Sequence, residues 1–238
     1  MREFGAKVPK IKQLRSIGVN SPQMVRAAGT PAILYGCHIS GVSDTGLNAA
    51  RSKVASAASP AAGGRNPTLA LLAMDGSAGT LDPGFEAHVE PTKHWALAVW
   101  ERWQPREQLV TAFANAATKL ASAVGSPWSM VHGPTTAVIT TLERLGWQMP
   151  SATEMITDMG HSLDLTLDPP IAIVNECKDS VRRWRLRLAN RILPGLVPCT
   201  PDVGPAIPSA NDRLVTTISG LSSLVKGKKC KASAGKIH

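Results

Sequence analysis

Two short patterns in the chain place polar residues at spacings that known enzymes use. Residues 41–46 read GVSDTG, and the nucleophile elbow of serine hydrolases is Gly-x-Ser-x-Gly between a strand and a helix. Here the second glycine comes one residue late and the preceding residues have a helical pattern, so we interpret the serine as a helix N-cap. His88 and Glu90 have the His-x-Glu spacing of zinc deaminases, but that site also needs Pro-Cys-x-x-Cys. Cys199 follows a proline, and Asp202 stands where the second cysteine is required.

The remaining polar residues do not complete a catalytic or metal site. The chain has no glycine-rich phosphate loop ending in Lys-Ser or Lys-Thr, and no adjacent aspartates for two-metal polymerase chemistry. The cysteines include no Cys-x-x-Cys pair that would indicate zinc; they are Cys37, Cys177, Cys199 and Cys230. We therefore predict no catalytic residue, no metal ligand and no cofactor, and we expect that the chain by itself is not an enzyme.

The charge of the chain gives the clearest functional signal. The formal net charge is +9 and the pI is about 9.7, which favours a polyanionic partner such as RNA or DNA. An anionic membrane surface comes second, but no segment approaches the roughly 20 apolar residues of a membrane span, and we expect no membrane partner. The charged N-terminus does not resemble a signal peptide, so we expect an intracellular protein of the nucleus or cytoplasm.

Basic residues gather at a few places along the chain. In the predicted helix that contains RRWRLR, the acidic neighbours are few, namely Glu176 and Asp179, and a further lysine cluster follows at residues 226–231. Charge runs often only solvate a helix face, but unbalanced arginines on a rigid helix suit phosphate contacts. The residues predicted to contact nucleic acid are Lys7, Lys10, Lys12, Arg15, Arg26, Arg51, Lys53, Arg182, Arg183, Arg185 and Arg187.

The first 59 residues have the pattern of short helices. A basic helix is predicted to end at Gly18, and Ser21 followed by proline predicts the start of the next one. Pro31 lies inside the apolar stripe of that second helix, which must kink or split there. Ser43 or Asp44 is expected to cap a third helix, whose apolar face leaves Arg51 and Lys53 to one side.

Apolar residues recur every three or four positions through the middle of the chain. Residues 59–92 are rich in Pro, Gly and Ala and are predicted to be loop, with a short helix at residues 66–74. The segment KHWALAVWERW predicts a helix with one apolar side, formed by Trp95, Val99 and Trp103. Further helices are predicted from Pro105 to about Val124 and over residues 134–145.

The periodicity changes near residue 155. Alternating leucines at 163, 165 and 167 predict a half-buried strand, and Asp158–His161 supplies the turn of a β-hairpin. A long helix follows Asp168-Pro169-Pro170. Its RWRLRL stretch also alternates like a strand, but the spacing of three and four persists for about 20 residues and favours the helix, with Trp184 on its buried side. Beyond Pro194 the composition predicts a poorly ordered tail.

The segment GTPAILYGCHISGVSDTGLNAARSKVASA resembles the region that follows the palm in LINE-like, non-LTR retrotransposon reverse transcriptases. In that family a helix with a P-x-x-x-Y-G element is followed by a short linker and a helix that begins with leucine. Pro31, Tyr35-Gly36 and Leu47 match these positions here. The resemblance covers residues 5–193 and includes HWALAVWERW, GPTTAVITTLERLGWQM and DLTLDPPIAIVNECKDSVRRWRLR. The fingers and palm of the family, with the catalytic Asp-Asp signature, are missing.

The resemblance implies a thumb and connector that contact a template–primer duplex through phosphates. We expect a mainly α fold, a thumb-like helical bundle with a small β-hairpin, a long C-terminal basic helix and a disordered tail. The expected function is binding of RNA or an RNA–DNA duplex by a retrotransposon fragment; the alternative is a non-catalytic structural or protein-interaction module with solvated basic faces. The expected parts are a thumb-like segment (1–59), a loop and helical connector (60–125), an α+β segment (126–193) and a basic tail (194–238).

Overall fold

The computed structural model describes residues 2–60, 65–75 and 80–194, and these are mainly helical with one small antiparallel sheet. The expected fold class is therefore confirmed. The expected tail lies outside the described residues. The helices are α1 (Arg2–Ser16), α2 (Ser21–Met24), the π-helical turn η1 (Val25–Gly29), α3 (Thr30–Leu34), α4 (Cys37–Ser40), α5 (Asp44–Ala58), α6 (Pro67–Asp75), α7 (Gly84–Trp100), α8 (Arg106–Ala121), the 3-10 turn η2 (Pro127–Met130), α9 (Pro134–Leu145) and α10 (Pro170–Ile192).

Local sequence signals explain how the short N-terminal helices begin and end. Asn20, one residue before the predicted Ser21, caps α2, because its side chain accepts a hydrogen bond from the backbone N–H of Gln23 (3.2 Å). Pro31 sits in the first turn of α3, where its missing N–H costs nothing. The predicted helix does not split at Pro31, because α2, η1 and α3 follow one another without a gap; the π-helical turn η1 just before Pro31 interrupts the α-helical pattern. Ser43 caps α5, as predicted, by accepting from the N–H of Gly46 (3.2 Å).

The prediction that residues 59–92 form a loop is wrong for its last part. Helix α7 already begins at Gly84 and runs through Pro91 to Trp100. Phe85 and Val89 are both buried and extend the stripe of Trp95 and Val99 back by two turns. The burial of this stripe outweighs the backbone hydrogen bond that a proline inside a helix forfeits. Trp103 lies beyond the helix and is 45% exposed, so it does not belong to the stripe as predicted.

The sheet has three strands, β1 (Gln148–Ser151), β2 (Glu154–Ile156) and β3 (Ser162–Asp164), in the order β1-β2-β3 and antiparallel throughout. The predicted hairpin corresponds to β2 and β3, which pair Met155 with Leu163. Thr157–His161 forms the turn, in which Gly160 has φ 84°. The strand β1 was not predicted, because it is short, contains Pro150 and has no alternation of apolar residues.

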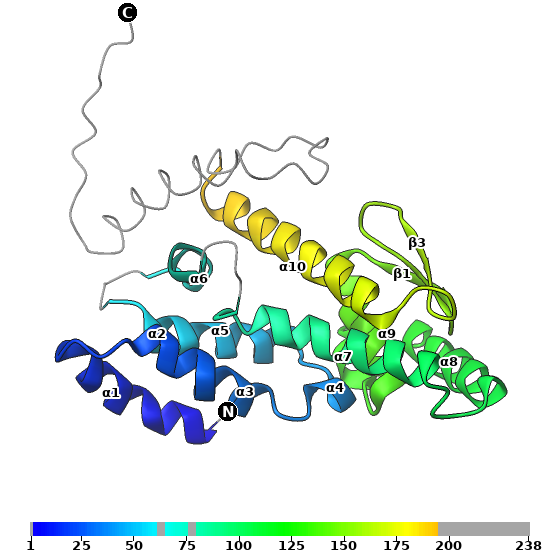
Figure 1. Ribbon diagram of the computed structural model, residues 1–238, viewed down its shortest axis with the longest axis horizontal. Helices are drawn as coiled ribbons and strands as arrows, with labels where there is room; N and C mark the ends of the chain where they lie inside the picture. The colour runs from blue at the N-terminus through cyan, green and yellow to red at the C-terminus, as the bar shows by residue number, and fades with distance from the viewer. Residues whose placement is uncertain (1, 61–64, 76–79, 195–238) are drawn as a thin grey trace, which may run out of the picture.

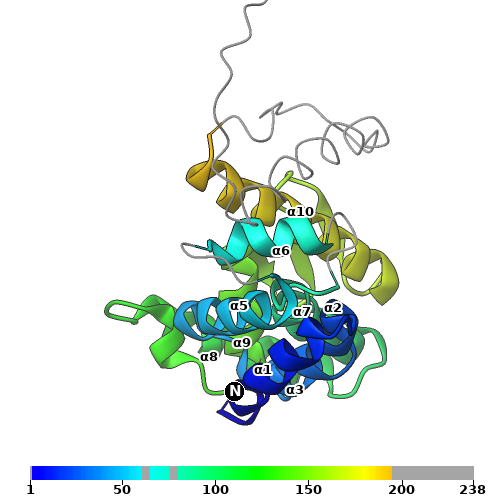
Figure 2. The ribbon, with the colours of Figure 1, turned by 90° about the vertical axis from the view of Figure 1, so that its left-hand side faces the viewer.

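Helix α7 lies at the centre of the fold. It packs against α10 on one side and α9 on another, and also contacts α3, α4 and α5. In Figures 1 and 2, α1 and α10 lie on opposite sides of the layer that contains α5 and α7. The basic residues of α1 and those of α10 therefore belong to different surfaces.

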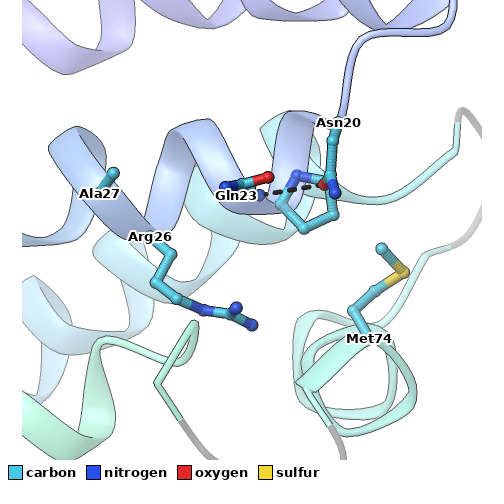
Figure 3. A pocket seen from close by; sticks show the side chains of 6 residues that line it. Asn20, Gln23, Arg26, Ala27 and Met74 are labelled. Atoms are coloured by element: carbon cyan, nitrogen blue, oxygen red, sulfur yellow. Dashed lines mark hydrogen bonds between the residues drawn. The ribbon is translucent and has the colours of Figure 1, made fainter.

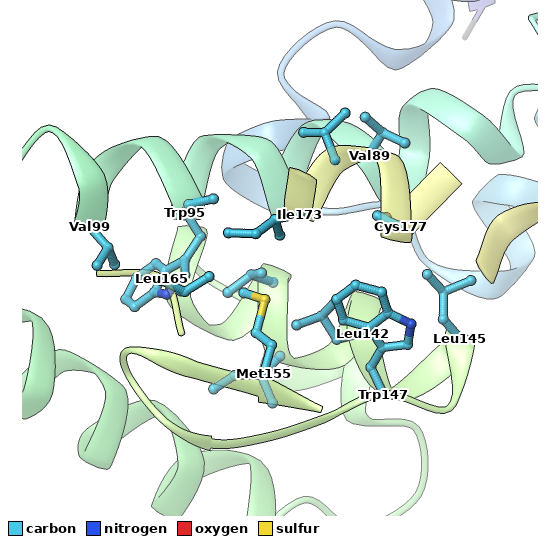
Figure 4. Packing of buried hydrophobic residues seen from close by; sticks show 14 of the residues in the cluster. Val89, Trp95, Val99, Leu142, Leu145, Trp147, Met155, Leu165, Ile173 and Cys177 are labelled. Carbon is cyan, nitrogen blue, oxygen red and sulfur yellow. The ribbon is translucent and has the colours of Figure 1, made fainter. Parts of the chain in front are cut away.

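Two larger apolar cores support these surfaces, beside a small third cluster that joins α3, α4, α5 and α7. The larger one joins α7, α9, the sheet and α10 through buried side chains that include Trp95, Leu142, Trp147, Met155 and Ile173 (Figure 4). The smaller one joins α1, η1, α5 and α6. The predicted buried side of α10 is confirmed for Val174, Cys177 and Val181, whereas Trp184 is half-buried and Ile171 and Ile192 at its ends are exposed. Ile173, which was not predicted to be buried, is buried as well.

Candidate nucleic-acid interface

Helix α1 presents lysines around a narrow apolar stripe. Phe4, Val8 and Ile11 are buried against α5 and its neighbours, while Lys7, Lys10 and Lys12 are exposed. At 100° per residue, Lys7 and Lys10 fall on one flank of the stripe and Lys12 on the other. No acidic side chain among the described residues forms an ion pair with these three lysines.

Two other predicted residues lie beside α1 but in different environments. The side chain of Lys53, on α5, lies close to Gly5 of α1: a Cβ atom placed on Gly5 would be 3.5 Å from Lys53 Nζ. Arg15 is half-buried, and its Nη1 donates to the backbone carbonyls of Ala57 (3.1 Å) and Ser59 at the end of α5. Arg15 therefore ties α1 to α5, whereas Lys53 lies beside the exposed lysines of α1. Lys7, Lys10 and Lys12 are called the lysine face of α1 below.

Arg26 lies on a separate depression of about 540 Å³ between α2 and η1 on one side and α6 on the other. Figure 3 shows its side chain extending from η1 toward Met74 of α6. The guanidinium is 3.7 Å from Asp75 Oδ1, and the side chain is 43% exposed. Its charge is partly compensated, so Arg26 is not part of the lysine face of α1.

The structure overturns the expectation that Arg51 and Arg185 face solvent, because only 3% and 2% of these residues is exposed. Arg51 Nε and Nη2 donate to the two carboxylate oxygens of Asp82, both at 3.0 Å. Arg185 Nε lies 3.0 Å from Asp82 Oδ2, and its Nη2 lies 3.6 Å from Asp75 Oδ2. Arginines paired in this way are not available for phosphate contacts. These four residues are called the buried charge cluster below.

The two aspartates of the buried charge cluster differ in environment. Burial raises the pKa of Asp82, but Arg51 and Arg185 together outweigh it and hold the pKa below its ordinary value. Burial also raises the pKa of Asp75, and there it is only partly offset by the N–H of Leu81 and by Arg185. Asp82 Oδ1 further accepts the N–H of Gly84 (2.8 Å) at the start of α7. Asp82 is thus the residue on which the cluster depends most.

The other predicted arginines of α10 remain at the surface. Arg182 pairs with Asp179 on the same helix. Arg183 binds Asp158 through Nε to Oδ2 (3.0 Å) and Nη2 to Oδ1 (2.6 Å), and Arg187 Nη1 donates to Oδ2 (3.1 Å). Asp158 is in the turn between β2 and β3 and is only 5% exposed at its side chain. These two arginines therefore fasten the sheet to α10.

This Asp158 contact makes the stability of the fold depend on pH. Burial raises the pKa of Asp158, but hydrogen bonds from Arg183, Ser180 and Arg187 outweigh it, so the folded pKa lies well below the ordinary 3.8. Because the folded pKa is depressed, the stabilisation is fully present above about pH 5 and is lost progressively as the pH falls from about 4 toward the folded pKa. We expect Asp158→Asn to lower the unfolding free energy by about 2 kcal/mol at pH 7, and the difference from wild type to shrink below about pH 4. Urea unfolding at several pH values measures it.

The control for this experiment is Asp179→Asn, which removes an exposed ion pair and is expected to change little at any pH. His88 is buried and neutral, because burial lowers its pKa from 6.5 to about 3. Protonation of His88 destabilises the folded state in acid. It does so equally in the wild type, Asp158→Asn and Asp179→Asn, so it cancels when their unfolding free energies are subtracted. A constant difference between Asp158→Asn and wild type down to pH 3 would contradict the assignment.

The sequence contains a signal that Arg51 and Arg185 are buried, which a prediction from charge alone does not use. Arg185 continues the row of Ile173, Cys177 and Val181 at four-residue spacing, and that row is the buried side of α10. On α5, Arg51 stands between Leu47 and Val54 on the buried stripe. A charge on such a stripe must find a buried partner. No sequence signal identified Asp75 and Asp82 as those partners, or Asp158 as the partner of Arg183 and Arg187.

No protein-family model, curated protein or solved structure matches the chain. The resemblance to non-LTR reverse transcriptases stays a prediction from short motifs.

Two negative findings apply to residues 2–60, 65–75 and 80–194. None of their helices combines the length and the apolar character needed to cross a bilayer. None of their His, Cys, Asp and Glu side chains form a group of three or more that could hold a metal ion.

Proposed function

We propose that the chain binds the phosphate backbone of RNA or of an RNA–DNA duplex through the lysine face of α1, without a catalytic step of its own. The observation that carries the proposal is the set of exposed lysines on this helix, Lys7, Lys10 and Lys12, which form no ion pair with the part of the chain that the structure describes. Lysine is a strongly hydrated point charge that contacts phosphates without a fixed geometry. Such contacts give affinity without sequence selectivity.

The charge distribution supports the same surface. Glu3 and Asp44 are the acidic residues between residues 1 and 60. Asp44 pairs with Arg144 of α9 (2.8 Å), so its charge is compensated away from α1. Lys53 adds a positive charge beside Gly5. A helix with this surplus attracts a polyanion over a distance of about one Debye length. The resemblance of residues 5–193 to a reverse-transcriptase thumb and connector supports a template–primer duplex as the partner.

The salt dependence of binding tests the proposal. We expect the association constant for an RNA–DNA duplex to fall steeply with log[salt], by about 0.9 per phosphate contact. The triple variant K7Q/K10Q/K12Q removes three charges while keeping good helix formers. The slope of log association constant against log[salt], called the salt slope below, should become less steep in this variant by about two to three units. Fluorescence anisotropy between low and physiological salt measures it.

The matched control is K93Q/R106Q/K119Q, which removes the same charge from α7 and α8. It is expected to leave most of the slope in place, because these residues are not on α1. An equal loss in both triple variants would mean that only net charge matters. A duplex affinity that does not change with salt would favour the alternative, a protein-interaction module with solvated basic faces.

A further inference from the structure

A second basic surface lies at a depression of about 530 Å³ between the end of α9 and the last turns of α10. Trp184 and Leu188 are among its partly buried lining residues, and Arg187 and Arg191 among its exposed ones. Glu143 and Asp158 are the acidic residues of its lining. We call this surface the α10 depression. Helix α10, which forms one wall of it, lies on the side of α5 and α7 away from α1 (Figures 1 and 2).

Arg187 is held in a fixed orientation at this depression. Its Nη1 donates to Asp158 Oδ2 (3.1 Å), and its Nη2 donates to the backbone carbonyl of Leu145 (3.0 Å) at the end of α9. The side chain is nevertheless 47% exposed. A guanidinium has five N–H donors, so Arg187 keeps donors beyond these two contacts. An oriented donor of this kind binds an oxyanion with little loss of side-chain entropy.

The charges around the depression do not cancel. Asp158 is shared by Arg183 and Arg187, and Arg183 already binds both of its oxygens. Arg191 follows Arg187 by one turn and forms no ion pair within the described part of the chain. Glu143 forms no ion pair with a cation of the described residues, and burial raises the pKa of its carboxyl. Arg187 and Arg191 therefore leave a local surplus of positive charge.

We propose that the α10 depression binds a phosphate of a polynucleotide backbone between Arg187 and Arg191, with the adjoining sugar against Trp184 and Leu188. Side chains four residues apart on a helix have Cβ atoms about 5–6 Å apart, so both guanidiniums can approach the same phosphate. The partner class rests on the proposed function, but the surface is a different one. The chain then has two phosphate-binding surfaces on opposite sides of α5 and α7.

The test uses Arg191→Gln, because Arg187 also holds the sheet in place. The matched control is Arg182→Gln, which removes the same charge nine residues earlier, on the opposite face of α10. We expect Arg191→Gln to weaken the binding of an RNA–DNA duplex about fivefold at low salt and to lower the salt slope by about one unit. Arg182→Gln should change the affinity less than about twofold. Fluorescence anisotropy gives the affinities, and urea unfolding checks that both variants keep wild-type stability.

The outcomes separate this inference from the proposed function. Equal effects of the two arginine variants, or no effect of Arg191→Gln, would overturn the α10 site while the α1 lysine variant still tests the proposed function. A loss in Arg191→Gln with full binding by K7Q/K10Q/K12Q would support the α10 site and contradict the α1 face. Inorganic pyrophosphate is the second probe. If Arg191→Gln abolishes pyrophosphate binding but leaves duplex affinity unchanged, the depression takes a small phosphorylated ligand and the polynucleotide assignment is wrong.

Discussion

Replacing Asp82 by alanine is expected to lower the free energy of unfolding by about 3–5 kcal/mol. The variant leaves Arg51 and Arg185 buried with Asp75 as the remaining carboxylate of the cluster. A buried cation without its partner loses the Coulomb attraction that offsets its desolvation. The variant also removes the acceptor of the Gly84 N–H at the start of α7. Urea unfolding followed by circular dichroism measures the loss.

Two further variants make this experiment specific. Asp179→Ala breaks the exposed pair with Arg182 and should cost no more than about 0.5 kcal/mol. The double variant Asp82→Ala with Arg185→Met should be more stable than the sum of the single changes, because it removes the uncompensated charge. If Asp82→Ala were as mild as Asp179→Ala, the buried charge cluster would not hold α5 to α10.

Replacing Trp147 by alanine is expected to cost about 3–5 kcal/mol, as for other buried tryptophans. The ring is 2% exposed within the larger core, in contact with α9, the sheet and α10 (Figure 4). Its Nε1 donates to Ser180 Oγ (2.8 Å), and Ser180 Oγ donates to Asp158 Oδ1 (2.6 Å). The variant therefore removes apolar packing and also the hydrogen bond to Ser180, which in turn donates to Asp158. Thermal unfolding should shift down by about 10 °C.

Trp147→Phe separates the two contributions, because it keeps most of the apolar ring and removes the indole N–H. It is expected to cost about 1–2 kcal/mol, close to the value of one buried hydrogen bond with imperfect repacking. Trp103→Ala is the control, since that ring is 45% exposed and should cost within about 1 kcal/mol. A large effect at Trp103 and a small one at Trp147 would contradict the described core.

Much of the fold followed from apolar spacing and helix signals. Ser43 as a cap and the helix over residues 134–145 both depend on local stereochemistry, which the sequence displays directly. The start of α7 did not follow, because Pro91 and the glycines before it are loop signals. Only the burial of Phe85 and Val89 against distant helices overrides them. The strand β1 likewise depends on its partner β2 and not on its own composition.

The candidate interface was also predictable only in part from the sequence. Exposure of Lys7, Lys10 and Lys12 followed from the apolar stripe of α1, because residues off a short stripe face water. Among the arginines of α10, the four-residue spacing from Ile173 to Arg185 marks only Arg185 as buried, and no pattern shows which of the others pair with an aspartate. Arg185 is buried, Arg183 and Arg187 hold Asp158, and Arg191 is exposed. Their partners come from residues 75–82 and 158, which no local pattern connects to α10.

The buried charge cluster also sets an order for folding during synthesis. Arg51, Asp75 and Asp82 are synthesised well before Arg185, which lies near the end of the described chain. The Nη2 of Arg185 also donates to the backbone carbonyl of Leu71 (3.4 Å), a contact that spans 114 residues. Until α10 docks, Asp82 has Arg51 as its buried cation and Asp75 has the half-exposed Arg26, and both carboxylates lack the contribution of Arg185. Contacts that span so much of the chain form late. Docking of α10 brings Arg185 to both carboxylates, so we expect the N-terminal helices to reach their full protection against proteases only after α10 has been synthesised.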